Sequence, residues 1–273
     1  RWPIRNGGEV EDLYTGKVER DRLKVPRDCI TPQAIDLLNS PYLSEMARSM
    51  GGEHSFVVSD LHLGSEFFHK TEFFTWLDQL PVGARLIFNG DIIDEPKKPL
   101  PEAHVEVIDR LVEESRQRPL VWVRGNHDVG FDLEDSGEIE FADRWEIGKR
   151  LLLVHGDDLD DVMPRHSLFK WTFKRFYRLL VKMGAPKVHV AEYAKKWGFL
   201  YRVLNDSVAR NALRVAKRLG FESIACGHTH AAMDVQRDGR RYLNTGAWTE
   251  KPLHYLEIDE EMIQLKIFEE GNA

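Results

Sequence analysis

An aspartate and a histidine stand two residues apart where an apolar run ends, in the stretch FVVSDLHLGS of residues 56–65. Side chains alternate along an extended segment, so Asp60 and His62 are expected on the same side of the chain. A carboxylate and an imidazole placed this way can form a pair of metal ligands. An ordinary polar loop is the commoner explanation of one such pair, so the rest of the chain must supply further ligands.

Four later apolar runs end in residues of the same types. RLIF is followed by NGDIID, LVWVR by GNHD, LLLV by HGD and SIAC by GHTH. Glycine permits tight turns and close backbone approach, and strand ends that face one way bring distant residues together. The sequence therefore predicts one site built from Asp60, His62, Asp91, Asp94, Asn126, His127, His155, His228 and His230.

The ligand types restrict the chemistry. Carboxylate, imidazole and amide oxygen without thiolate suit manganese, iron or zinc rather than a soft metal. The histidines of His228-Thr229-His230 can each serve a different ion, and the two oxygens of Asp91 can bridge two ions. Two ions about 3.5–4 Å apart suit phosphoester cleavage, because they clamp the phosphate and convert a water to hydroxide.

The ordered motifs D-x-H, G-D-x-x-D, G-N-H-D, H-G and G-H-x-H resemble those of the calcineurin-like metallophosphoesterases. The resemblance implies a four-layer α/β/β/α sandwich and two divalent ions, with manganese expected first and iron or zinc as alternatives. It implies that one ion is held by Asp60, His62, Asp91 and His230, and the other by Asp91, Asn126, His155 and His228. It further implies that His127 contacts the phosphate and helps to protonate the leaving oxygen, with Asp94 orienting His127.

The elements that must position these residues follow an α/β pattern. Near-continuous apolar runs alternate with helical stretches near residues 66–80 and 101–116, which predicts a sheet covered on both faces with functional loops at its strand ends. The last runs, around residues 253–268, alternate more and are expected to be antiparallel. One domain is expected over residues 53–273, after a partly helical extension over residues 1–52 in which no chemistry is visible.

Composition narrows the function classes further. No apolar run approaches the roughly 18–20 residues of a membrane span, and residues 1–30 lack the apolar core of a secretory signal, so a cytoplasmic location is expected. Cys29 and Cys226 support neither a disulfide framework nor a cysteine-based zinc site. The net charge of −7 argues mildly against a general nucleic-acid binder, and none is expected as a partner.

Other polar residues near the motifs have simpler explanations. Asp128 is interpreted as a loop residue or a support for the site, and so is Asp94 where it takes no direct part. A solvated loop or a helix start explains the acidic run after His155, which consists of Asp157, Asp158, Asp160 and Asp161. Surface or packing positions are expected for His54, His69, His104, His166, His189 and His254.

A helical cap insertion is expected at about residues 162–219. Residues 162–191 contain no acidic residue, and on a helix Lys170, Lys174, Arg178 and Lys182 would form a cationic ridge beside an apolar strip. Such a helix suits an anionic membrane surface, although packing of the strip on the protein explains it as well. The substrate contacts expected from this region are Lys170, Lys174, Arg178, Trp197 and Tyr201.

With this insertion, the chain is most similar to the branch of UDP-2,3-diacylglucosamine pyrophosphatases of lipid A synthesis. The resemblance implies a manganese-dependent enzyme, peripheral to the inner membrane, that cleaves a pyrophosphate by metal-activated water and releases UMP. Residues 125–128 read GNHD where that branch usually has GNRD, so a phosphodiesterase of nucleotides or other soluble diesters is the alternative. A non-catalytic metal-binding scaffold would be expected to lack ligands, and every expected position is filled.

Overall fold

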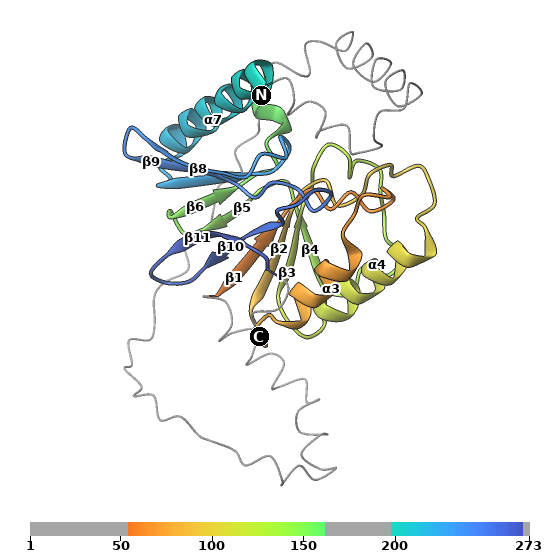
Figure 1. The fold of residues 1–273 in the computed structure, drawn as a ribbon. Coiled ribbons are helices and arrows are strands. Elements are labelled where there is room, and N and C mark those ends of the chain that lie inside the picture. The colour runs from red at the N-terminus through yellow and green to blue at the C-terminus, as the bar shows by residue number, and fades with distance from the viewer. Residues whose placement is uncertain (1–53, 162–197, 270–273) are drawn as a thin grey trace, which may run out of the picture. The chain divides into compact units, whose positions relative to one another are not determined.

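Two β-sheets form the centre of the computed structural model, which describes residues 54–161 and 198–269 (Figure 1). The first sheet has the strand order β11-β10-β1-β2-β3-β4 and the second the order β5-β6-β7-β9-β8. The first contains β1 (Ser55–Val58), β2 (Arg85–Asn89), β3 (Leu120–Val123), β4 (Ile139–Ala142), β10 (His254–Ile258) and β11 (Ile263–Ile267). The second contains β5 (Trp145–Ile147), β6 (Leu151–Leu153), β7 (Ser223–Cys226), β8 (Met233–Arg237) and β9 (Arg240–Asn244).

The strands that precede the chemical motifs run parallel within each sheet. β1 pairs with β2, β2 with β3 and β3 with β4 in parallel register, and β6 pairs with β7 in the same way. The carboxyl ends of parallel strands share one edge of a sheet, so the loops that follow them are neighbours. The last strands, β10 and β11, pair antiparallel, which confirms the prediction from their alternating sequence.

Alternate residues along the strands face different layers. In β1, Phe56 and Val58 belong to the apolar cluster that includes α3 (Lys70–Asp78) and α4 (Glu102–Ser115). Val57, between them, belongs instead to the cluster that includes Leu153 of the second sheet. This period of two is what a sheet covered on both faces requires.

A third apolar cluster lies between the second sheet and α7 (Gly198–Leu219). Ala212 and Ala216 of α7 pack with Ile224 of β7 and Tyr242 of β9 in one apolar cluster. The layers are therefore α3 and α4, the first sheet, the second sheet, and α7 (Figure 1). This is the predicted α/β/β/α sandwich.

The predicted cap partly overlaps this sandwich. Residues 162–197, which include Lys170, Lys174, Arg178 and Trp197, lie outside the described residues, as does the predicted extension over residues 1–52. The range predicted for the cap reaches residue 219, but α7 supplies the outer layer of the sandwich up to that residue. Among the described residues, no helix is both long enough and apolar enough to cross a membrane.

Candidate metal centre

The loops that follow five strands bring the predicted side chains together. Asp60 and His62 follow β1, Asp91 and Asp94 follow β2, Asn126 and His127 follow β3, His155 follows β6, and His228 and His230 follow β7. The two sheets are joined at this edge because Asn89, the last residue of β2, donates a hydrogen bond to the carbonyl oxygen of Val154, which follows β6 (3.0 Å). Loops from both sheets therefore surround one small volume.

The first group of side chains consists of Asp60, His62 and His230, all of them buried. The Nε2 atoms of the two histidines lie 3.1 Å apart, and Nε2 of His230 lies 3.3 Å from Oδ1 of Asp60. Each residue offers one ligand atom, and the three atoms lie within 4.8 Å of one another. One carboxylate oxygen and two imidazole nitrogens at this spacing can hold a divalent cation.

The second group consists of Asp91, His155 and His228. His155 donates a hydrogen bond from Nδ1 to the carbonyl oxygen of Asn89 (3.1 Å), and its Nε2 lies 3.0 Å from Oδ2 of Asp91. The other oxygen of Asp91 accepts the backbone N–H of His127 (2.8 Å). Anchoring one imidazole nitrogen leaves the other for a cation, which is how metal-binding histidines are usually held.

Electrostatics favours positive charge at this centre. Burial opposes ionisation of Asp91, but the neighbouring imidazoles, His155 first and then His62 and His127, outweigh it and hold the pKa of Asp91 well below its usual range. Burial likewise opposes a charge on His155, yet Asp91 and Asp60 raise its pKa to about 10. Buried carboxylates that draw protons onto nearby imidazoles would bind a divalent cation in the same way, so the donor set fits a metal site.

Asp94 contacts two histidines by different atoms. Its carboxylate Oδ1 lies 3.2 Å from Nδ1 of His62, whereas its backbone carbonyl oxygen accepts a hydrogen bond from Nδ1 of His127 (2.7 Å). The carboxylate is 3.9 Å from that His127 nitrogen. The predicted orienting of His127 is thus made by the Asp94 backbone. Asn126, one residue before His127, has an exposed side chain.

Comparison with known proteins identifies the family of the chain. Residues 55–232 match the family model described as calcineurin-like phosphoesterase. The chain belongs to the calcineurin-like phosphoesterase family. No curated protein matches it.

Several solved structures are similar to this phosphoesterase. Yfce, a phosphoesterase from E. coli, shares 18% identity over 79% of this chain and 97% of its own, with a TM-score of 0.41. The Pseudomonas putida nuclease MPE shares 14% identity over 78% of this chain and 87% of its own, with a TM-score of 0.39. Vacuolar protein sorting 29 from Cryptosporidium parvum shares 14% identity over 79% and 96%, with a TM-score of 0.40.

The backbone of the phosphoesterase is strained at the residues that line the centre. Six non-glycine residues of the described chain have a positive φ, and five of them are candidate ligands: Asp60 (53°), His62 (50°), Asp91 (53°), His228 (63°) and His230 (55°). The left-handed region costs such residues on the order of 1–3 kcal/mol each and is found where function requires it. The ligand loops are therefore shaped for this site rather than for local stability.

Three glycines of the motifs leave room for the ligands. A Cβ atom on Gly90 would lie 2.4 Å from Nδ1 of His155, one on Gly125 would lie 2.3 Å from Oδ1 of Asp91, and one on Gly227 would lie 2.2 Å from Oδ2 of Asp60. These distances are far below van der Waals contact. Each glycine is thus required by a neighbouring ligand, in agreement with the close approach predicted for the strand ends.

A matched pair of glycine substitutions tests this requirement. Gly90 and Gly130 have φ values of 88° and 85°, but a Cβ on Gly130 would meet nothing within 4 Å. Gly130→Ala is expected to lower the free energy of unfolding by about 1 kcal/mol through backbone strain alone. Gly90→Ala adds the collision with His155 and is expected to lower the free energy of unfolding by about 3 kcal/mol. Equal losses in urea denaturation of the two variants would contradict this assignment.

Three supporting residues hold the loops of the candidate ligands. Asp128 is buried and accepts hydrogen bonds from the backbone N–H of Ile92, Ile93 and Gly125 and from Nε1 of Trp122. It therefore ties the loop after β2 to the loop after β3. Asn244 of β9 donates to the carbonyl oxygen of Gly227 (2.6 Å), next to His228. The interpretation of Asp128 as a support for the site is thus confirmed, whereas the role of Asn244 has no sequence signal beyond proximity to a motif.

The third supporting residue corrects a prediction. Asp158 and Asp161 are exposed, as expected for a solvated loop, but Asp160 is 3% exposed and its Oδ2 lies 3.0 Å from Nε2 of His228. The prediction for Asp160 is wrong because the 3-10 turn η2 (Asp157–Leu159) turns the chain back toward the centre.

Tyr201 is the one predicted substrate contact that lies within the described residues. It belongs to α7, and its hydroxyl donates a hydrogen bond to the carbonyl oxygen of Thr229 (2.9 Å), which stands between His228 and His230. Burial raises the pKa of Tyr201, so the hydroxyl stays a donor at neutral pH. Tyr201 thus holds a ligand loop, whatever it contributes to substrate binding.

His104 contacts the ligand loop after β1, although only a surface or packing position is expected for it. Its Nδ1 accepts a hydrogen bond from the backbone N–H of Gly64 (2.7 Å), two residues beyond His62. Burial and the neighbouring Lys70 lower the pKa of His104. Below about pH 6.5 the unfolded chain therefore binds a proton that the folded chain resists, and stability falls on acidification.

The variant His104→Asn is expected to remove this part of the pH dependence. The difference in unfolding free energy between wild type and variant should shrink as pH falls from 7 to 5.5, by well under about 1.4 kcal/mol per pH unit because the half-buried ring is screened by solvent. Urea denaturation at several pH values measures it. A difference that stays constant over this range would contradict a depressed pKa.

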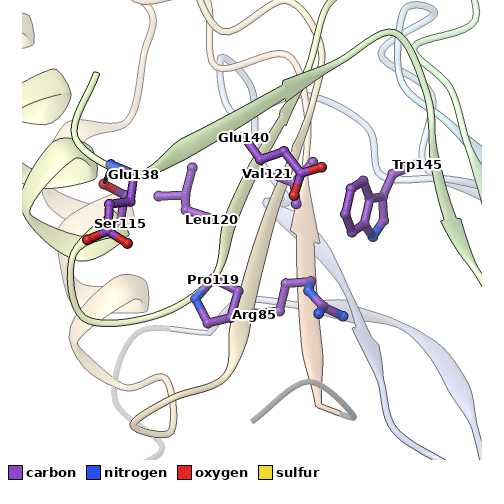
Figure 2. Close-up of a pocket in the computed structure, with 8 residues that line it drawn as sticks. All are labelled: Arg85, Ser115, Pro119, Leu120, Val121, Glu138, Glu140 and Trp145. Atoms are coloured by element: carbon purple, nitrogen blue, oxygen red, sulfur yellow. Dashed lines mark hydrogen bonds between the residues drawn. The ribbon is translucent and has the colours of Figure 1, made fainter. Parts of the chain in front are cut away.

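A pocket of about 200 Å³ lies at the other end of the first sheet (Figure 2). It is lined by Arg85, Ser115, Pro119, Leu120, Val121, Glu138, Glu140 and Trp145. Arg85 and Leu120 begin β2 and β3, whereas the candidate ligands follow the opposite ends of these strands. The pocket therefore does not belong to the metal centre.

Proposed function

We propose that this phosphoesterase binds two divalent cations and hydrolyses the pyrophosphate of a lipid nucleotide similar to UDP-diacylglucosamine. The observation that carries the proposal is the pair of side-chain groups, Asp60 with His62 and His230, and Asp91 with His155 and His228. Bound cations supply charge that stabilises a phosphoester transition state and an activated water. Manganese is proposed first, with iron and zinc as alternatives, because these ligands suit all three.

The proposed ligand sets share Asp91. One set is Asp60, His62, Asp91 and His230, and the other is Asp91, Asn126, His155 and His228. Asp91 suits a shared position because its Oδ2 faces His155 while its Oδ1 accepts the N–H of His127, so both oxygens lie at the centre. Asn126, an exposed residue of the loop after β3, would complete the second set through its amide oxygen.

His127 is proposed to contact the phosphate and to give a proton to the leaving oxygen. Its Nδ1 is committed to the carbonyl oxygen of Asp94, which leaves Nε2 as the nitrogen that can reach a substrate. The side chain is 39% exposed, in contrast to the buried His62 beside it. A partly exposed imidazole at the rim of the centre is suited to meet a phosphate that enters from solvent.

The lipid nucleotide is supported by the basic and aromatic residues 162–191, from which Lys170, Lys174 and Arg178 are proposed to meet phosphates. Trp197 and Tyr201, which follow this segment, are proposed to meet an apolar group. An anionic membrane surface is proposed as a partner of the same segment, at the inner face of the cytoplasmic membrane, and no nucleic acid is proposed. Binding to anionic vesicles that does not weaken with added salt would contradict this partner.

The deciding experiment is hydrolysis of UDP-2,3-diacylglucosamine with added manganese, followed by UMP release beside a generic aryl phosphodiester. UMP release that exceeds diester cleavage and disappears in Asp91→Ala supports the lipid nucleotide. Cleavage of the diester alone rejects it and favours the second candidate, a phosphodiesterase of soluble nucleotides, which the histidine of GNHD supports. Turnover of neither substrate would favour a metal-binding scaffold.

A further inference from the structure

A buried carboxylate just before the predicted insertion contacts a candidate metal ligand. The side chain of Asp160 has no exposed surface (0%), and its Oδ2 accepts a hydrogen bond from Nε2 of His228 at 3.0 Å. Burying an ionised carboxylate is unfavourable unless it is paired or accepts hydrogen bonds. The hydrogen bond from the imidazole of His228 therefore compensates for the burial of the Asp160 carboxylate.

The fold fixes the position of Asp160 from both sides. Its backbone N–H donates to the carbonyl oxygen of Asp157 (3.2 Å), which closes the turn η2. Asn211 of α7 donates from Nδ2 to the carbonyl oxygen of Leu159 (2.9 Å) and to Oδ2 of Asp161 (3.0 Å). Hydrogen bonds to the residues before and after Asp160 prevent the turn from moving away from His228.

The contact decides which nitrogen of His228 is left to bind a cation. The backbone N–H of His228 lies 3.1 Å from both carboxylate oxygens of Asp60, so the residue itself is anchored in its left-handed conformation. With Nε2–H donated to Asp160, the neutral ring keeps its lone pair on Nδ1. His155 is held in the opposite sense, with Nδ1–H donated to a backbone carbonyl and Nε2 left for the centre.

We propose that Asp160 is a positioning residue that fixes the tautomer and the ring orientation of His228, and thereby strengthens cation binding by the set that contains Asp91, His155 and His228. This inference rests on the proposed function and deepens it. A carboxylate behind a metal-binding imidazole both orients the ring and makes it a better ligand. A carbonyl partner, as His155 has, orients the ring without adding negative charge.

The test compares Asp160→Asn and Asp160→Ala with Asp158→Asn, which changes an exposed carboxylate in the same turn. Titration of the full chain with manganese, followed by the electron paramagnetic resonance of free Mn²⁺, is expected to show two sites in wild type and in Asp158→Asn. In Asp160→Ala one site is expected to weaken by about 10- to 100-fold and the other to remain. Asp160→Asn keeps an oxygen acceptor without the charge, so its manganese affinity at the weakened site is expected to lie between those of wild type and Asp160→Ala.

A second readout keeps the inference separate from the proposed function. Nitrogen-15 NMR of histidine-labelled, metal-free protein is expected to show His228 protonated on Nε2 in wild type and a mixture of tautomers in Asp160→Ala. An unchanged tautomer, or equal weakening of both manganese sites, would overturn the role of Asp160 even if the wild type hydrolyses phosphoesters. A wild type that binds no manganese would instead overturn the proposed function, while the tautomer still tests Asp160.

Discussion

Replacing Asp91 with asparagine is expected to lower kcat/KM for phosphoester hydrolysis at least about 1,000-fold, which corresponds to about 4 kcal/mol of transition-state stabilisation. In the wild type, Oδ1 of Asp91 accepts the backbone N–H of His127 at 2.8 Å. Asparagine keeps the shape of the side chain and an oxygen that can accept the same hydrogen bond. It loses the negative charge beside His155 and the second oxygen that lies 3.0 Å from Nε2 of that residue. A neutral amide with one oxygen cannot take the shared position that is proposed for Asp91.

The measurement is a steady-state assay at saturating manganese, with Asp158→Asn as the control. Asp158 is exposed in the turn after His155, so its loss should leave kcat/KM near the wild-type value. Urea denaturation of the metal-free proteins checks that Asp91→Asn folds. A folded variant that keeps more than about a tenth of the wild-type kcat/KM would reject Asp91 as a shared ligand.

The arrangement of the candidate ligands was predictable because it follows from strand direction. Apolar runs without alternation indicate parallel strands, and the carboxyl ends of parallel strands meet at one edge. The same reasoning placed Asp60 beside His230 although 170 positions separate them in the sequence, and the structure puts the two side chains 3.3 Å apart. Within each motif, glycines then allow the candidate ligands to approach the backbone closely, as Gly227 does for Asp60.

The supports of the ligands were not predictable in the same way. For Asp128 the sequence left a loop residue and a support as alternatives, because Asp128 acts through the backbone N–H of Ile92 and Gly125, and backbone groups leave no trace in the sequence. Asp160 became buried because the turn η2 and Asn211 redirect the chain, and neither feature can be read from the run HGDDLDD. For α7, the helical pattern was clear, but its packing partner was not: alanines such as Ala212 fit a close contact with a sheet as readily as a cap.

Replacing His127 with asparagine is expected to lower kcat by about 100-fold or more for a substrate with an alkyl or nucleotide leaving group. The amide nitrogen of asparagine can still donate to the carbonyl oxygen of Asp94, as Nδ1 of His127 does at 2.7 Å, so the loop after β3 should keep its conformation. Asparagine offers nothing in place of Nε2, the nitrogen that can carry a proton to the leaving oxygen. Manganese binding should remain at the wild-type level.

The leaving group separates proton donation from phosphate binding. A nitrophenolate leaves without protonation, so cleavage of an aryl diester should lose only the few-fold contribution of His127 to phosphate contact, whereas an alkoxide needs the proton. Rates for a series of diesters with leaving groups of rising basicity measure this difference, and the ratio of wild type to Asn variant should grow along the series. A ratio that stays constant would mean that His127 acts on the phosphate alone, because binding energy to the phosphate does not depend on the group that departs.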